Sequence, residues 1–122
     1  MNTLASARQE IKLVLDQAGY SVWPFIPERV TPPVVILEPG SPYMNEGDAF
    51  TLFVCRFELI MLAATATNSK ATEDLDQMIV DCVDALDMYY IEEVSKPMQI
   101  EANGVAYLGT TISISDKKEI KT

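Results

Sequence analysis

Apolar residues recur at three- and four-residue spacing in two segments, which predicts two amphipathic helices. The first runs from Leu4 to Ala18, with a possible cap at Asn2 or Thr3 and a left-handed stop at Gly19. The second runs from about Ala71 to Tyr90. Its apolar stripe comprises Leu75, Met78, Ile79, Cys82, Leu86 and Tyr89. Each helix therefore has one face to bury against another layer.

In addition to the two helices, short segments rich in strand-forming residues predict four strands. A strand is expected at 20–23, where Pro24 ends it or confines it to a sheet edge, and another at 34–38. Two more, at 98–102 and 105–115, flank Asn103-Gly104, which is a type I′ hairpin signal. The charged residues 116–122 are expected to form a flexible tail.

The longest alternating segment, from Ala49 to about Met61, predicts an unusually long strand. Such a strand would extend roughly 43 Å at about 3.3 Å per residue, beyond the roughly 30 Å of a compact domain of this size. One face is apolar and is expected to be the core face: Phe53, Cys55, Phe57, Leu59 and Met61. The other face places Arg56 and Glu58 between apolar flanks, as expected where a sheet meets a neighbouring subunit.

These elements predict one α+β domain over residues 1–122. Two helices with one apolar stripe each can cover one face of a sheet, which gives two layers. The sheet is expected to be antiparallel or mixed, with about five strands.

Composition narrows the classes of function. A net charge of −9 argues against a nucleic-acid binder, since phosphate binding depends on clustered Lys and Arg. The chain contains no histidine, which removes Ser-His-Asp and Cys-His catalysis and the usual general base, so an enzyme is not expected. Cys55 and Cys82 are expected to be buried free thiols in a reducing compartment. No membrane helix, signal peptide or cofactor motif is visible, and a cytosol-like site of synthesis is expected.

Four segments together resemble the tail terminator proteins of long-tailed bacteriophages. They are Arg29–Val35, the Glu38–Tyr43 loop, the acidic turn Glu46–Asp48 and Val105–Ile114. The resemblance covers most of the chain and lies in the order and spacing of these segments. It implies a homohexameric ring at the neck of the virion, made in the host bacterial cytoplasm. Such a ring stops polymerisation of the tail tube, binds the major tail tube protein and a head-side connector or stopper, and lets DNA pass through a central channel.

The loop at 41–48 is the first candidate contact surface. Tyr43 and Met44 are the apolar anchors expected against the tail tube or a neighbouring subunit, and Glu46 and Asp48 accompany them. The alternative is an ordinary hairpin loop.

Arg56 and Glu58 form the second candidate, a charge pair for an inter-subunit contact. The alternative is a solvated pair on one strand face, worth well under about 1 kcal/mol.

The acidic face of the second predicted helix is the third candidate. Asp74, Asp81, Asp84 and Asp87 occur in a stretch with no Lys or Arg between Lys70 and Lys96. A solvated helix face is the expected explanation, and a DNA-repelling channel lining is the other. Asp74-Leu75-Asp76 lacks the glycine and distal glutamate of a calcium loop, so no metal site is expected.

Three other functions stay open at this point. Another neck component, such as a stopper or head-completion protein, belongs to the same class. A small α+β binding module with no virion role belongs to another. A metal-dependent nuclease using Asp48 and Glu58 is disfavoured, because no lysine follows Glu58 at the required offset.

Overall fold

A six-stranded mixed sheet with two helices forms the molecule, which confirms the α+β class. The computed structural model describes residues 2–47, 51–65 and 68–119. Its elements, in chain order, are α1 (Thr3–Gln17), β1 (Ser21–Trp23), β2 (Val34–Glu46), β3 (Leu52–Ala64), α2 (Ser69–Ala85), β4 (Tyr90–Val94), β5 (Met98–Ala102) and β6 (Val105–Glu119). The strand order is β1-β2-β3-β6-β4, with β5 paired to β6. Among the strands that the structure describes, β1 and β2 are the one parallel pair.

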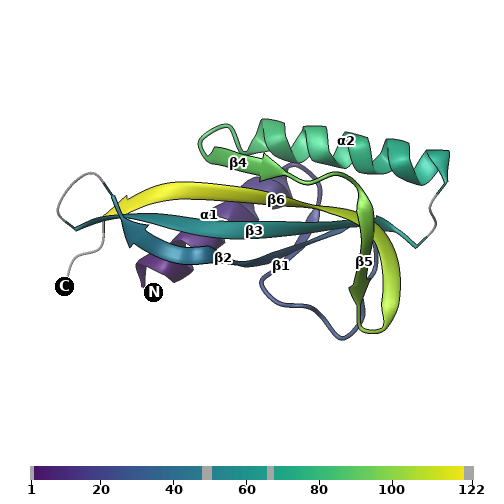
Figure 1. Ribbon diagram of the computed structural model, residues 1–122, viewed down its shortest axis with the longest axis horizontal. Coiled ribbons are helices and arrows are strands. Elements are labelled where there is room, and N and C mark those ends of the chain that lie inside the picture. The colour runs from purple at the N-terminus through teal and green to yellow at the C-terminus, as the bar shows by residue number, and fades with distance from the viewer. Residues whose placement is uncertain (1, 48–50, 66–67, 120–122) are drawn as a thin grey trace.

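Three long antiparallel strands form a ribbon along the whole molecule (Figure 1). β2 and β3 have 13 residues each and β6 has 15. The β3–β6 ladder runs from Leu52 opposite Glu119 to Ala64 opposite Leu108. The predicted long strand is therefore present, but it covers Leu52–Ala64 instead of 49–61, and Thr51 lies in a turn. It is paired on both sides over most of its length.

Both helices pack on the same face of this ribbon, as predicted. Asn2 caps α1 by accepting a hydrogen bond from the Ala5 amide at 2.7 Å, and Asn68 caps α2 in the same way at 2.9 Å from Ala71. The core contains the apolar stripes of α1 and α2 together with Cys55, Phe57, Leu59 and Met61 of β3. The core face of the long strand is thus the one that the alternation predicted.

A hairpin covers one end of the opposite face. β5 and β6 are joined by Asn103 (φ 51°) and Gly104 (φ 77°), the two positive φ values that a type I′ turn requires. The hairpin encloses a second apolar cluster, which comprises Val34, Ile36, Leu62, Ala102 and Tyr107. Asn103 also donates hydrogen bonds to the carbonyls of Pro27 and Glu28, at 2.6 and 3.2 Å, and so anchors the 24–33 segment beside the turn.

The prediction for the second helix was wrong at its C-terminal end. α2 ends at Ala85, and Tyr90–Val94 forms strand β4, where the sequence predicted the end of the helix and an irregular connection. Tyr90 and Ile91 lie opposite Ser115 and Ile114 of β6, because the free edge of β6 offers hydrogen-bonding groups that a helix would leave unpaired. The sheet therefore has six strands instead of about five.

Two segments predicted to be irregular are strands. β2 continues through the expected 38–48 loop as far as Glu46, with an irregularity between Pro39 and Met44. Prolines are tolerated there because β1 pairs with β2 only at 34–36, so the outer side of β2 needs no donor beyond that point. The expected flexible tail is also wrong for 116–119, which belong to β6 and pair with β3. Asp48, Ala49, Phe50 and residues 120–122 lie outside the described residues.

Candidate functional site

The predicted contact loop is part of the β2 strand and packs largely inward. The Tyr43 ring lies edge-on to Phe57, with centroids 5.7 Å apart and an interplanar angle of 85°. The Tyr43 hydroxyl accepts a hydrogen bond from Arg8 Nη2 of α1 at 2.8 Å. Met44 lies opposite Cys55 and packs against the same core. Tyr43 and Met44 therefore contribute to the packing of α1 on the ribbon.

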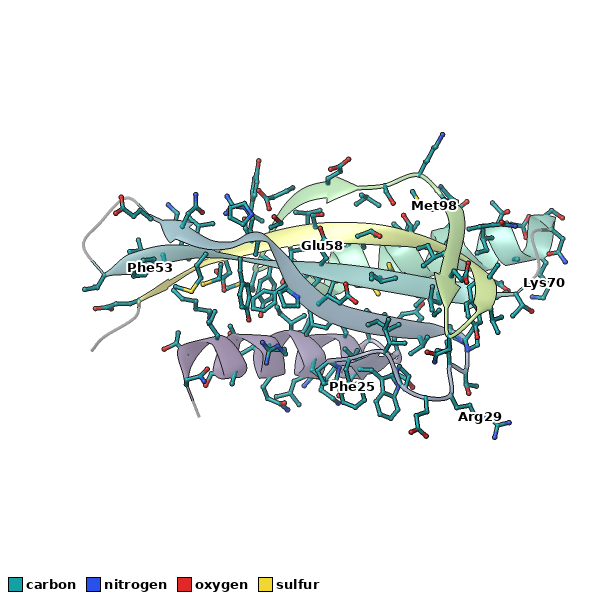
Figure 2. The ribbon with its side chains drawn as sticks, turned by 60° about the horizontal axis from the view of Figure 1, so that its bottom comes forward. Phe25, Arg29, Phe53, Glu58, Lys70 and Met98 are labelled. Atoms are coloured by element: carbon teal, nitrogen blue, oxygen red, sulfur yellow. The ribbon has the colours of Figure 1, made fainter. Side chains whose placement is uncertain are left out.

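Only Glu46 of the described residues in this group is exposed. It is the last residue of β2 and lies opposite Phe53, which Figure 2 shows near one end of the ribbon. The fourth residue of the prediction, Asp48, is outside the described part of the chain.

Arg56 is paired within its own chain. Its Nε lies 3.4 Å from both carboxylate oxygens of Glu92 in β4, and Nη1 donates to Asn45 Oδ1 of β2 at 2.5 Å. The Arg56 and Glu92 side chains retain 22% and 32% exposure, so water weakens their attraction but does not remove it. Arg56 thus links three strands, on the face of the sheet opposite the helices.

Glu58 lies on this face too, near the middle of the ribbon (Figure 2). It stands opposite Glu38 of β2 on one side and Ser113 of β6 on the other, and Ser113 stands opposite Glu93 of β4. One row across four strands therefore carries three carboxylates: Glu38, Glu58 and Glu93. Neither Arg56 nor any other described basic side chain makes an ion pair with them.

The acidic residues of the second predicted helix do not converge on one site. Asp81 accepts hydrogen bonds from Tyr20 Oη at 2.7 Å and from Gln77 Nε2 at 2.8 Å, and these bonds lower the pKa of its carboxyl. Asp74 lies 3.5 Å from Lys70, and Asp84 borders an open depression between α1 and α2 with Asp81. Asp87 follows the helix in a turn and is exposed.

No metal centre is formed by these carboxylates in the part of the chain that the structure describes. No group of three or more Cys, Asp or Glu side chains there is placed to hold an ion. Cys55 and Cys82 are both buried and unbridged, as predicted. Burial raises the pKa of the Cys82 thiol to about 12.

Two groups of exposed apolar side chains were not identified from the sequence. The first group lies at the end of β1: it contains Trp23, the last residue of that strand, and Phe25 and Ile26, which follow it. The second group lies at β4: it contains Tyr90 and Val94, the first and last residues of that strand, and Met88, which precedes it. The sequence signal for the first was present: an aromatic pair around Pro24, in a segment predicted to be an edge strand.

The first of these groups borders two hollows beside α1. A cavity of about 220 Å³ lies between α1 and β1 and is lined by Ala5, Arg8, Gln9, Lys12, Val22, Pro24 and Leu37. A second hollow of about 370 Å³ is lined by Lys12, Asp16 and residues 21–25. Trp23 and Phe25 meet edge-on, with ring centroids 5.9 Å apart. This side of the molecule therefore combines exposed aromatic rings with Arg8 and with Lys12, whose ammonium forms an ion pair with Asp16 at 2.8 Å.

None of the described helices is both long and apolar enough to span a membrane. No protein-family model matches the chain, and no match was found among curated proteins.

Proposed function

We propose that the chain is a structural subunit of a bacteriophage virion, a tail terminator that forms a ring at the top of the tail tube. In this role it performs no chemistry. It stops tube polymerisation, joins the major tail tube protein to a head-side connector or stopper, and surrounds the passing DNA.

One observation carries the proposal: both outer strands of the sheet present exposed apolar side chains at their edges. Pro24 after β1 and Glu92 and Glu93 in β4 are residues of the kind that protect edge strands, yet large apolar side chains remain exposed beside them. Here Phe25 beside β1 is 58% exposed and Tyr90 of β4 is 71% exposed. Two such edges on one sheet favour a subunit that is covered on both sides by copies of itself.

The row of Glu38, Glu58 and Glu93 supports the role of a channel. These carboxylates lie on the sheet face that neither helix covers. If that face lines the ring, the row repels the DNA phosphates and lets the polymer move without specific binding. The net charge of −9 agrees with a partner that must pass through rather than stay bound.

The test is deletion of the coding gene from a phage genome that carries it, with complementation from a plasmid. Electron microscopy of the lysate should show tails of abnormal and variable length that are not joined to heads, and the plasmid should restore normal particles. Tails of normal length joined to heads in the deletion strain would refute the proposal. Light scattering of the complementing protein should give a species near six times the 13.5 kDa subunit mass.

A further inference from the structure

The cavity of about 220 Å³ between α1 and the first two strands has an apolar floor and a polar roof. Val22 of β1 and Leu37 of β2 line the floor, and both are buried. The roof is one face of α1, because positions 5, 8, 9 and 12 follow the three- and four-residue spacing of a helix face. Ala5 carries only a methyl group, and the three longer side chains end in polar groups that burial would penalise. The sequence of α1 thus supplies no large apolar side chain to fill this space.

Arg8 is the cation of this cavity that has no carboxylate partner among the described residues. Its Nη2 donates a hydrogen bond to the neutral Tyr43 hydroxyl at 2.8 Å, and none of the ion pairs formed by those residues includes its guanidinium. The other cation of the lining, Lys12, forms an ion pair with Asp16 at 2.8 Å. The positive charge that a ligand in this cavity can pair with is therefore that of Arg8.

Arg8 differs in this respect from the other half-buried basic side chains that the structure describes. Lys12, Arg56 and Lys118 each lie within 3.4 Å of a carboxylate oxygen. A half-buried charge has lost part of its hydration, so a carboxylate that approaches it is attracted more strongly than at the open surface. A guanidinium has five N–H donors in a planar fork, and one hydrogen bond to a hydroxyl leaves most of them for a ligand.

The volume and lining of the cavity restrict the size and charge of its ligand. An apolar cavity of roughly 150 Å³ binds benzene, so the volume of about 220 Å³ admits one six-membered ring with a short acid-bearing chain. Val22, Pro24 and Leu37 supply apolar contacts for the ring, and a guanidinium fork matches the two oxygens of a carboxylate. A ligand with two or more negative charges would leave charge uncompensated against the apolar floor. A monocarboxylate with an apolar body fits both restrictions.

We propose that the cavity between α1 and β1 binds small apolar monocarboxylates. The apolar body of the ligand packs against Val22 and Leu37, and its carboxylate accepts hydrogen bonds from the Arg8 guanidinium. The ligand class is that of free arylalkanoic acids whose apolar body is about the size of one aromatic ring. This inference goes beyond the proposed function and does not rest on it, so either can fail without the other.

Titration of the full chain with 3-phenylpropionate at neutral pH tests the site. Saturation-transfer NMR is the readout, because it detects weak ligands on a monomer and on a ring alike. The neutral analogue 3-phenylpropionamide has the same ring and chain length but no charge. The acid is expected to bind roughly tenfold more tightly than the amide, because a hydrogen bond between charged groups is stronger than one to a neutral group.

Variants at three positions locate the ligand. Arg8→Gln should weaken binding of the acid roughly tenfold and leave binding of the amide unchanged, whereas Arg8→Lys should retain part of the preference for the acid. Ala5→Leu adds an apolar side chain to the cavity lining and should abolish binding of both compounds. Arg29→Gln is the matched control, since Arg29 is exposed and does not line the cavity, and both compounds should bind to it as they bind to the unchanged protein.

Each result decides the inference. Equal affinities for the acid and the amide overturn it, and this comparison uses the unchanged protein, so it holds even where a variant fails to fold. Acid binding that survives Ala5→Leu places the ligand elsewhere and overturns it, and so does equal weakening in Arg8→Gln and Arg29→Gln. The absence of saturation transfer to either compound at millimolar concentration overturns it as well.

Discussion

Glu38 of β2 lies directly opposite Glu58 of β3 on the sheet face that neither helix covers. Both carboxylates are half-buried, and neither forms an ion pair with another described residue. Like charges at directly opposite positions of an antiparallel pair destabilise it. The two carboxylates therefore repel each other near the middle of the ribbon. If this face lines a DNA channel, as proposed, the same negative charge would repel the DNA phosphates.

Replacing one of these glutamates should stabilise the isolated protein. Glu58→Gln is expected to raise the free energy of unfolding by about 0.2–1 kcal/mol, and the gain should shrink in high salt because salt screens the repulsion. Glu38→Gln should behave alike, and the double variant should gain less than the two singles together. Urea denaturation measures these values. Glu101→Gln, at an exposed position of β5 opposite Ala106, is the control, and an equal gain there would contradict the repulsion.

Tyr43 should behave as a packing residue. Tyr43→Phe removes the hydrogen bond from Arg8 and is expected to cost about 0.5–1 kcal/mol. Tyr43→Ala also removes the contact with Phe57 and should cost about 2 kcal/mol. Chemical denaturation gives both numbers, and Tyr90→Phe is the exposed-tyrosine control. Unchanged stability in Tyr43→Ala would mean that this ring is free to dock on a partner.

The Tyr20–Asp81 hydrogen bond should make stability depend on acidic pH. The Tyr20 hydroxyl and the Gln77 amide lower the pKa of the Asp81 carboxyl below 3.8 in the folded state. A group with a lowered folded pKa stabilises the fold above its unfolded pKa and loses that contribution as pH falls through the folded value. In Tyr20→Phe, the free energy of unfolding should therefore decrease less steeply as the pH falls below about 4.

Thermal unfolding measured across this acidic range provides the test of the Asp81 linkage. Asp84→Asn removes a neighbouring exposed carboxyl and is the control. An unaltered acid profile in Tyr20→Phe would show that Asp81 does not depend on this bond.

Gly40 is required where β2 passes Arg56. A Cβ at position 40 would lie 2.6 Å from Arg56 Cβ and 2.9 Å from the Arg56 carbonyl carbon, closer than real contacts allow. Gly40→Ala should therefore destabilise the fold by about 1–3 kcal/mol, measured by urea unfolding. Ser41→Ala, at the next and exposed position, should change stability little. A stable Gly40→Ala variant would mean that β2 moves away from β3 at no cost.

The two cysteines should react only after unfolding. Both side chains are fully buried, and burial raises the pKa of the Cys82 thiol to about 12. Because the thiolate is the reactive form, alkylation by iodoacetamide should be slower than in the denatured chain by a factor of about 1,000 or more. Mass spectrometry after timed alkylation checks this, with an exposed Lys96→Cys thiol as the positive control. Rapid labelling of Cys82 would indicate that α2 opens locally.

The helices and the core face were predictable because they depend on local periodicity. The α1 stripe and the alternation from Phe53 to Met61 each place apolar residues on one side of their element. These apolar sides form the core. The cap at Asn2 and the turn at Asn103-Gly104 were equally local, since each depends on one or two residues.

The remaining elements depend on partners distant in sequence. Tyr89 and Tyr90 continue the helical spacing of α2, and only the free edge of β6 turns the segment after Ala85 into β4. The charged residues at 116–119 look like a tail, yet β3 supplies their backbone partners and Glu10 of α1 binds Lys118 at 2.9 Å. Arg56 was a candidate for an inter-subunit contact, with a solvated pair as the alternative. Its ion pair within the chain is with Glu92, a residue that the sequence placed outside the sheet.

Strand β6, the last in chain order, is inserted between β3 and β4. A nascent chain that has not yet reached β6 cannot attach β4 to the sheet at all, and the ladder between Leu52 and Glu119 closes only once Glu119 has been synthesised. Translation must therefore pass through β6 before a subunit can present both of its outer strands. Products truncated before this strand are thereby kept out of any assembly that uses those two strands.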